Sequence, residues 1–172
     1  MFSIKKCDVL PNSLVAPFLE KGYADSYRTE VNGYISLEDY VYNFYTSPLF
    51  KLERFILTWT VSKPSNDMDA QEIAKGNIEK FAAWTVENRN ENELLMCDFT
   101  HRTRSWFMVK EVGTSELPRT QLYFGTGVSP SVNKKSMGLL FNILLPFHKI
   151  YSISLLYFAK RQLSKSTTKL RD

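Results

Sequence analysis

Hydrophobic and polar positions follow two different periods along this chain. Five runs have the alternation and composition of β-strands, at residues 22–31, 80–87, 93–99, 103–112 and 119–128. Short, turn-rich connections join the last four runs, as is typical of an antiparallel meander. The sequence therefore predicts a sheet of about five strands.

Between the first two strands the hydrophobic residues recur at steps of three and four, as on one face of a helix. Ser36 and Ser47 are suitable N-caps, and Pro48 suits a first helical position. We predict helices over about 36–46 and 48–61 that pack on the sheet through one apolar face. That face comprises Leu37, Tyr40, Val41, Phe44, Tyr45, Leu49, Leu52, Phe55, Ile56 and Trp59. A polar loop over 63–69 follows, with a helical turn expected at 70–77.

The helical period returns after residue 134 and continues to residue 163. This stretch is apolar almost all round, and Pro146 is expected to divide it into an entry segment and a terminal helix over 146–163. Residues 164–172 are polar and basic, and we expect them to fray.

Together these elements predict a single α+β domain spanning residues 1–172, a length suited to one core. The helix pair and the long C-terminal helix are the only elements able to cover one face of the sheet. We therefore expect a curved antiparallel sheet packed on the C-terminal helix, an arrangement that leaves room for an apolar cavity.

Several segments resemble an uncharacterised, mainly bacterial family known as a domain of unknown function. They are YADSYRTEV (23–31), LLMCDFTHRTRSWFMV (94–109), TQLYFGTGV (120–128) and LPFHKIYSISLLYFAKRQL (145–163). The family is grouped with the START-like, polyketide-cyclase helix-grip superfamily, so the resemblance implies a helix-grip fold around an apolar ligand. Helix-grip domains usually carry six or seven strands. Either a further strand lies around 70–79, or the grip is incomplete and the cavity small.

The net charge of +4 is unevenly distributed along the chain. Residues 133–172 sum to +7, whereas residues 1–132 sum to −3 and contain all the aromatic strands. An RNA-binding sheet needs exposed aromatic residues among basic ones, so this distribution argues against a nucleic-acid partner. The basic end has two interpretations: cations that offset a helix dipole, or contact with an anionic membrane surface.

Residues 137–158 have the length of a membrane span, but His148 and Lys149 lie at the centre of this segment. The sequence therefore favours a buried or interfacial helix. Cys7 and Cys97 are too few for a disulfide framework, and no signal-peptide core is visible. We expect a cytoplasmic protein, with attachment to the inner face of the membrane through residues 137–165 as an alternative.

The densest polar cluster is Asp98, His101, Arg102 and Arg104, around a strand turn. Asp98 and His101 are the candidates for acid–base catalysis, although no nucleophile motif accompanies them. Arg102 and Arg104 are candidates for binding a carboxylate or phosphate. The alternative for all four is a solvated hairpin end held by cross-strand ion pairs.

Four further residues are candidate ligand contacts: Trp106, Tyr123, His148 and Tyr151. His148 could hold a polar head group, or hydrogen-bond the first turn of its helix. Large aromatic residues fill cores more often than they line pockets. The spacing of the histidines and acids defines no metal site, and no cofactor is expected.

The sequence thus favours a module that binds a small apolar or amphipathic ligand between the sheet and the C-terminal helix. Two alternatives remain: a cyclase- or hydrolase-like enzyme using Asp98 and His101, and a peripheral membrane protein.

Overall fold

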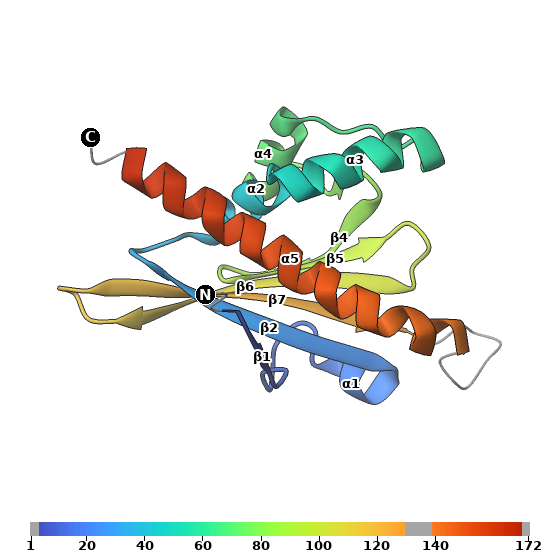
Figure 1. Ribbon diagram of the computed structural model, residues 1–172, viewed down its shortest axis with the longest axis horizontal. Coiled ribbons are helices and arrows are strands. Elements are labelled where there is room, and N and C mark those ends of the chain that lie inside the picture. The colour runs from blue at the N-terminus through green and yellow to red at the C-terminus, as the bar shows by residue number, and fades with distance from the viewer. Residues whose placement is uncertain (1–3, 130–138, 170–172) are drawn as a thin grey trace.

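The computed structural model describes residues 4–129 and 139–169, with their side chains except at 60–61, 139–148 and 166–169. Its elements form an antiparallel sheet with helices across one face (Figure 1). In chain order they are β1 (Lys5–Cys7), α1 (Pro17–Lys21), β2 (Tyr23–Asn32), α2 (Leu37–Tyr45), α3 (Pro48–Val61), α4 (Asp67–Lys75), β3 (Lys80–Phe81), β4 (Trp84–Arg89), β5 (Glu93–Asp98), β6 (Thr103–Gly113), β7 (Pro118–Val128) and α5 (Leu139–Lys169).

The sheet has seven strands in the order β1-β2-β7-β6-β5-β4-β3, and all described pairs are antiparallel. The predicted α+β class with an antiparallel sheet and a C-terminal helix is confirmed, but the expected count of about five strands is wrong. Strand β1 has only three residues, too few for a readable period. The predicted strand over 80–87 is two strands, separated at Ala82, whose φ of 49° interrupts the extended backbone. Residues 70–75 belong to α4, so no strand lies there.

The caps predicted for the helix pair are confirmed. Ser36 Oγ accepts a hydrogen bond from Asp39 N at 3.0 Å, and Ser47 Oγ accepts one from Phe50 N at 3.4 Å. Helix α4 begins inside the predicted loop because Asn66 and Asp69 form a reciprocal capping box.

The helices α2, α4 and α5 pack on one face of the sheet and form the main core. Phe44 lies at its centre, with ring centroids 4.7 Å from Phe107 and 4.9 Å from Phe124. A smaller cluster lies on the opposite face, under α1 and the N-terminal segment, and includes Phe18 and Trp106. Residues that alternate along β6 and β7 therefore enter two different cores.

The apolar face predicted for the helix pair is correct in α2 and at Leu49, and wrong in the rest of α3. Leu52, Phe55, Ile56 and Trp59 are 55%, 62%, 49% and 76% exposed. Helix α3 is oriented instead by Arg54, which is buried and donates hydrogen bonds to Asp67 Oδ1 at 2.8 Å, Ser65 O at 2.9 Å and Tyr45 O at 3.3 Å.

The helix α5 crosses the helical face of the sheet as one continuous element (Figure 1). The break expected at Pro146 does not occur. A proline removes one backbone donor, which costs about 3 kcal/mol within a helix. The burial of Leu155, Leu156, Ala159 and Leu163 anchors the later turns of α5 and can offset that cost. The helix continues to Lys169, so residues 164–169 of the expected tail are helical.

Within residues 4–129 and 139–169, no helix combines the length and the hydropathy needed to cross a bilayer. The segment expected to contact a membrane, 137–165, lies only partly within the described residues. Its buried leucines face the protein core, and attachment to a membrane stays a prediction.

Candidate functional site

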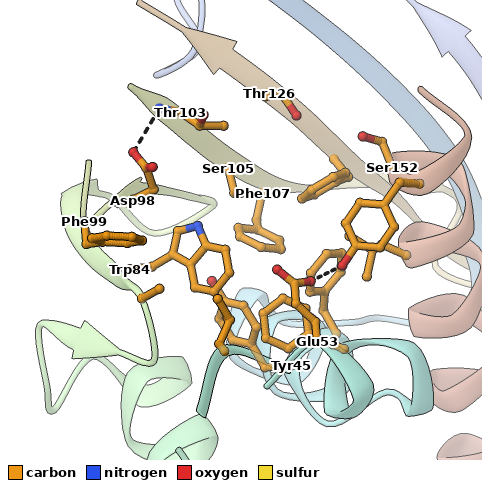
Figure 2. A pocket seen from close by; sticks show the side chains of 17 residues that line it. Tyr45, Glu53, Trp84, Asp98, Phe99, Thr103, Ser105, Phe107, Thr126 and Ser152 are labelled. Atoms are coloured by element: carbon orange, nitrogen blue, oxygen red, sulfur yellow. Dashed lines mark hydrogen bonds between the residues drawn. The ribbon is translucent and has the colours of Figure 1, made fainter. Parts of the chain in front are cut away.

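A cavity of about 260 Å³ lies between the sheet and the helices α2, α3 and α5. Its walls come from elements far apart in the sequence, and Figure 2 shows their side chains converging. The lining residues are Phe44, Tyr45, Phe50, Glu53, Leu57, Ala83, Trp84, Asp98, Phe99, Thr103, Ser105, Phe107, Phe124, Thr126, Tyr151, Ser152 and Leu155.

Aromatic rings make most of the apolar wall. Tyr45 and Phe50 have ring centroids 4.8 Å apart, and Trp84 continues the wall at 5.6 Å from Phe50. Strand β6 contributes Thr103, Ser105 and Phe107, because alternate residues of a strand face the same side. At the edge, Phe99 is 50% exposed and Tyr151 is 36% exposed.

Two hydroxyl groups in this wall are buried without a hydrogen-bond partner among the described residues. They belong to Tyr45 in α2 and Ser152 in α5, each 1% exposed. Burial raises the pKa of Tyr45 above its ordinary value, and the negative charge of Glu53 raises it further. A buried polar group without a partner normally costs about 1–3 kcal/mol. Both residues line the cavity, so these hydroxyls are the candidate polar contacts for a molecule bound there.

Glu53 supplies a carboxyl group to the same cavity. The hydroxyl of Tyr151 donates a hydrogen bond to Glu53 Oε2, joining α5 to α3 (Figure 2). Burial raises the pKa of Glu53 to about 6, although the bond from Tyr151 acts in the opposite direction. The carboxyl group is thus ionised at neutral pH in a largely apolar setting.

The predicted catalytic candidates Asp98 and His101 differ in their position relative to the cavity. The Asp98 carboxylate organises its own turn: Oδ1 accepts hydrogen bonds from Arg102 N and Thr103 N, both at 2.9 Å, and Oδ2 accepts one from the Thr100 hydroxyl. His101 is exposed at that turn with a φ of 57°, and it does not line the cavity. Of the two side chains, only that of Asp98 lines the cavity.

The predicted ligand contacts Arg102, Arg104, Trp106 and Tyr123 are not among the residues that line the cavity. Arg102 is exposed. Arg104 donates hydrogen bonds to Glu87 Oε2 at 2.8 Å and to His101 O at 2.7 Å. Its guanidinium also lies over the ring of Phe18, 5.0 Å from the centroid.

Trp106 and Tyr123 belong to the smaller core, on the face of the sheet opposite the cavity. Tyr151 lines the cavity, and the side chain of His148 lies outside the described residues. Of the dense polar cluster, only Asp98 lines the cavity.

Sequence reasoning missed Glu53, Tyr45 and Ser152 as site residues. One signal was available: Glu53 follows Phe50 by three positions and precedes Leu57 by four, so these residues share a helix face. An acid between two large apolar residues at helical spacing points inward when that face is buried. For Tyr45 and Ser152, no sequence signal distinguishes a partnerless hydroxyl from an ordinary core one.

A second hollow of about 280 Å³ lies beside α4 and the hairpin of β4 and β5. Its one arginine, Arg89, donates hydrogen bonds to the last carbonyls of α4, with Arg89 Nη1 2.7 Å from Ile73 O. The arginine in the wall of this hollow therefore acts as a cap for the C-terminal end of α4. Among the described residues, no group of three or more His, Cys, Asp or Glu side chains is placed to hold a metal ion.

No protein-family model, curated protein or solved structure matches this chain. The candidate site is therefore defined by its own geometry.

Proposed function

We propose that this protein is a non-enzymatic binding module that holds a small amphipathic molecule between its sheet and the helix α5. The observation that carries the proposal is the pair of buried hydroxyls of Tyr45 and Ser152, which line an aromatic cavity and have no hydrogen-bond partner within the described part of the chain. Buried polar groups are nearly always paired, and an exception calls for an explanation. A ligand with an apolar body and a polar end would satisfy both hydroxyls and fill the cavity.

The size of the cavity limits the ligand. An engineered cavity of about 150 Å³ can bind benzene, and pockets for drug-sized molecules begin at about 300 Å³. At about 260 Å³, this cavity suits a body of one or two fused rings rather than a long acyl chain.

The topology supports the helix-grip class implied by the family resemblance. A seven-stranded antiparallel sheet carries a helix pair after β2 and a long C-terminal helix across the face that contains the cavity. The two free cysteines support a reducing compartment, and a cytoplasmic location remains our proposal.

The test uses naphthylmethanol, a neutral two-ring probe, with a variant that fills the cavity. Ser105 lines the cavity from β6, whereas Lys110 on the same strand is exposed and lies outside it. We expect the probe to stabilise the wild type, and Ser105→Leu to abolish this effect while Lys110→Leu preserves it. At a concentration of about one hundred times Kd, the stabilisation is about 2.7 kcal/mol, or roughly 5–10 °C in Tm.

Two outcomes would overturn the proposal. One is the absence of any shift for the wild type with naphthalene-based probes of every charge. The other is an equal shift in Ser105→Leu, because that probe would be binding elsewhere.

A further inference from the structure

The charges that line the cavity restrict the polar end of the ligand, if the proposed binding function holds. Among the side chains that the structure describes, the lining includes two acids, Glu53 and Asp98, and no lysine, arginine or histidine. Neither of the arginines that the sequence offered for an anionic head group, Arg102 and Arg104, lines this cavity. A carboxylate or phosphate would therefore enter an apolar space in which the described lining supplies two acids and no cation to pair with it.

The two acids differ in how their oxygens are used. The Asp98 carboxylate accepts three hydrogen bonds from its own turn. The Glu53 carboxylate accepts one, from the hydroxyl of Tyr151. Among the described residues, no lysine or arginine forms an ion pair with Glu53. Its neighbour Arg54 is turned to Asp67. Glu53 thus has acceptor capacity and an unbalanced charge at the cavity.

The rings around Glu53 also favour a positive charge. The face of an aromatic ring carries a negative quadrupole that attracts cations, most strongly where water is excluded. Tyr45, Phe50 and Trp84 form a continuous wall of rings, and the Tyr45 ring also lies 5.6 Å from Phe107 between centroids. Figure 2 shows Glu53, Tyr45, Trp84 and Phe107 around one space. The Tyr45 and Ser152 oxygens can accept hydrogen bonds from a donor placed there.

We propose that the ligand is an organic cation, a protonated amine on a one- or two-ring body, whose nitrogen binds the Glu53 carboxylate within the aromatic wall. The N–H groups of the ammonium donate to Glu53 and to the free hydroxyl oxygens, and the ring body occupies the remaining apolar volume. This proposal rests on the binding function proposed above and specifies the charge of the ligand. The sequence suggested an anionic head group, whereas the cavity favours a cationic one.

The pKa of Glu53 allows the cation proposal to be tested by measuring how amine affinity depends on pH. Burial raises the pKa of Glu53 to about 6, so the carboxyl loses its charge in mildly acidic buffer. Among the described side chains, the titratable groups that face Glu53 are Tyr45 from α2 and Tyr151 from α5, with Asp98 across the cavity. Burial and Glu53 raise the pKa of both tyrosines, so neither loses its proton in this range. Amine affinity should fall about tenfold from pH 7 to pH 5.

The experiment compares three probes of one shape: naphthylmethylamine, naphthylmethanol and naphthoate. Affinities are measured by calorimetry near neutral pH for the wild type, Glu53→Gln and Glu38→Gln. Glu38→Gln makes the same charge change at an exposed position of α2, outside this cavity. For the wild type and Glu38→Gln, we expect the amine to bind at least tenfold more tightly than the alcohol, and naphthoate most weakly. In Glu53→Gln the preference of amine over alcohol should fall below about threefold, with alcohol affinity retained.

Each alternative result has a definite meaning. Equal binding of amine and alcohol by the wild type, stronger binding of naphthoate, or an amine preference that survives in Glu53→Gln would overturn the cation assignment and leave the binding function intact. Failure of all three probes would instead overturn the binding function itself. If Glu53→Gln does not fold, the rank order and pH profile of the wild type decide the question.

Discussion

Replacing Tyr45 with phenylalanine should stabilise the ligand-free protein. Tyr40 and Tyr45 both lie in α2, at 0% and 1% exposure. The hydroxyl of Tyr40 donates a hydrogen bond to Tyr123 O at 3.1 Å, whereas the hydroxyl of Tyr45 has no partner among the described residues. The same loss of one oxygen therefore removes a satisfied group at one position and an unsatisfied group at the other.

The magnitudes follow from this difference. A buried polar group without a partner costs about 1–3 kcal/mol, so Tyr45→Phe should raise the free energy of unfolding by about 1 kcal/mol or more. The ring itself is kept, with its centroids 4.8 Å from Phe50 and 4.5 Å from Phe81. Tyr40→Phe should lower the free energy by about 1 kcal/mol, because it leaves a buried carbonyl short of a donor. In a chain of this length, each kcal/mol corresponds to about 2–4 °C in Tm.

Urea unfolding followed by circular dichroism measures both variants against the wild type. The protein is first unfolded, dialysed and refolded to remove any bound molecule. A higher midpoint with an unchanged m-value for Tyr45→Phe, and a lower midpoint for Tyr40→Phe, is the expected pair of results. If Tyr45→Phe is as unstable as Tyr40→Phe, the Tyr45 hydroxyl is already satisfied in the folded protein. The main argument for a ligand then fails.

Three further substitutions test other parts of the structure. The raised pKa of Glu53 in the folded state favours folding below pH 4.5, and this contribution is lost as pH rises to about 6. The stability of Glu53→Gln relative to wild type should therefore increase by about 2 kcal/mol between pH 4 and pH 7 in urea titrations. Arg104→Ala should cost about 1–2 kcal/mol by losing its bonds to Glu87 and His101 O, yet leave the affinity for naphthylmethanol unchanged in calorimetry. Gly125→Ala should lower the unfolding free energy by about 1–3 kcal/mol in the same titrations, since the new Cβ would lie 2.6 Å from Asp25 O and 2.8 Å from the Trp106 ring.

The elements that could be predicted from sequence are those whose signal is local. Ser36 and Ser47 cap their helices through hydrogen bonds within three residues. The strands β2, β6 and β7 are long enough for their alternation to be read. Strand β1 could not be predicted because its three residues are defined by pairing with β2, where Lys5 lies opposite Arg28. The strand β1 pairs with residues about twenty positions later in the chain. Three residues are too few to show the alternation of polar and apolar positions that identifies a strand.

The candidate site was less predictable from the sequence. A cluster of polar residues that are close together along the chain can point to either face of the sheet. Arg104 and Ser105 are neighbours in β6, yet the first reaches Phe18 on the outer face and the second lines the cavity. The polar groups that matter, Tyr45, Glu53 and Ser152, come from three different helices. Only the packing of α2, α3 and α5 against the sheet brings them together.

The orientation of α3 accounts for both the exposed apolar residues of this helix and the position of Glu53 in the cavity. A hydrophobic stripe that includes Phe55 and Trp59 faces away from the core, although burying one such side chain contributes about 1.5–3 kcal/mol. The inward face carries Glu53 between Phe50 and Leu57, and the bonds of Arg54 to Asp67 and Ser65 hold the helix in place. Rotating α3 to bury the stripe would turn Glu53 out of the cavity. A helix that gives up apolar burial while presenting an acid to an aromatic wall breaks a local folding rule, and such departures concentrate at functional sites. The same orientation that exposes Trp59 is therefore the one that a cation-binding cavity requires.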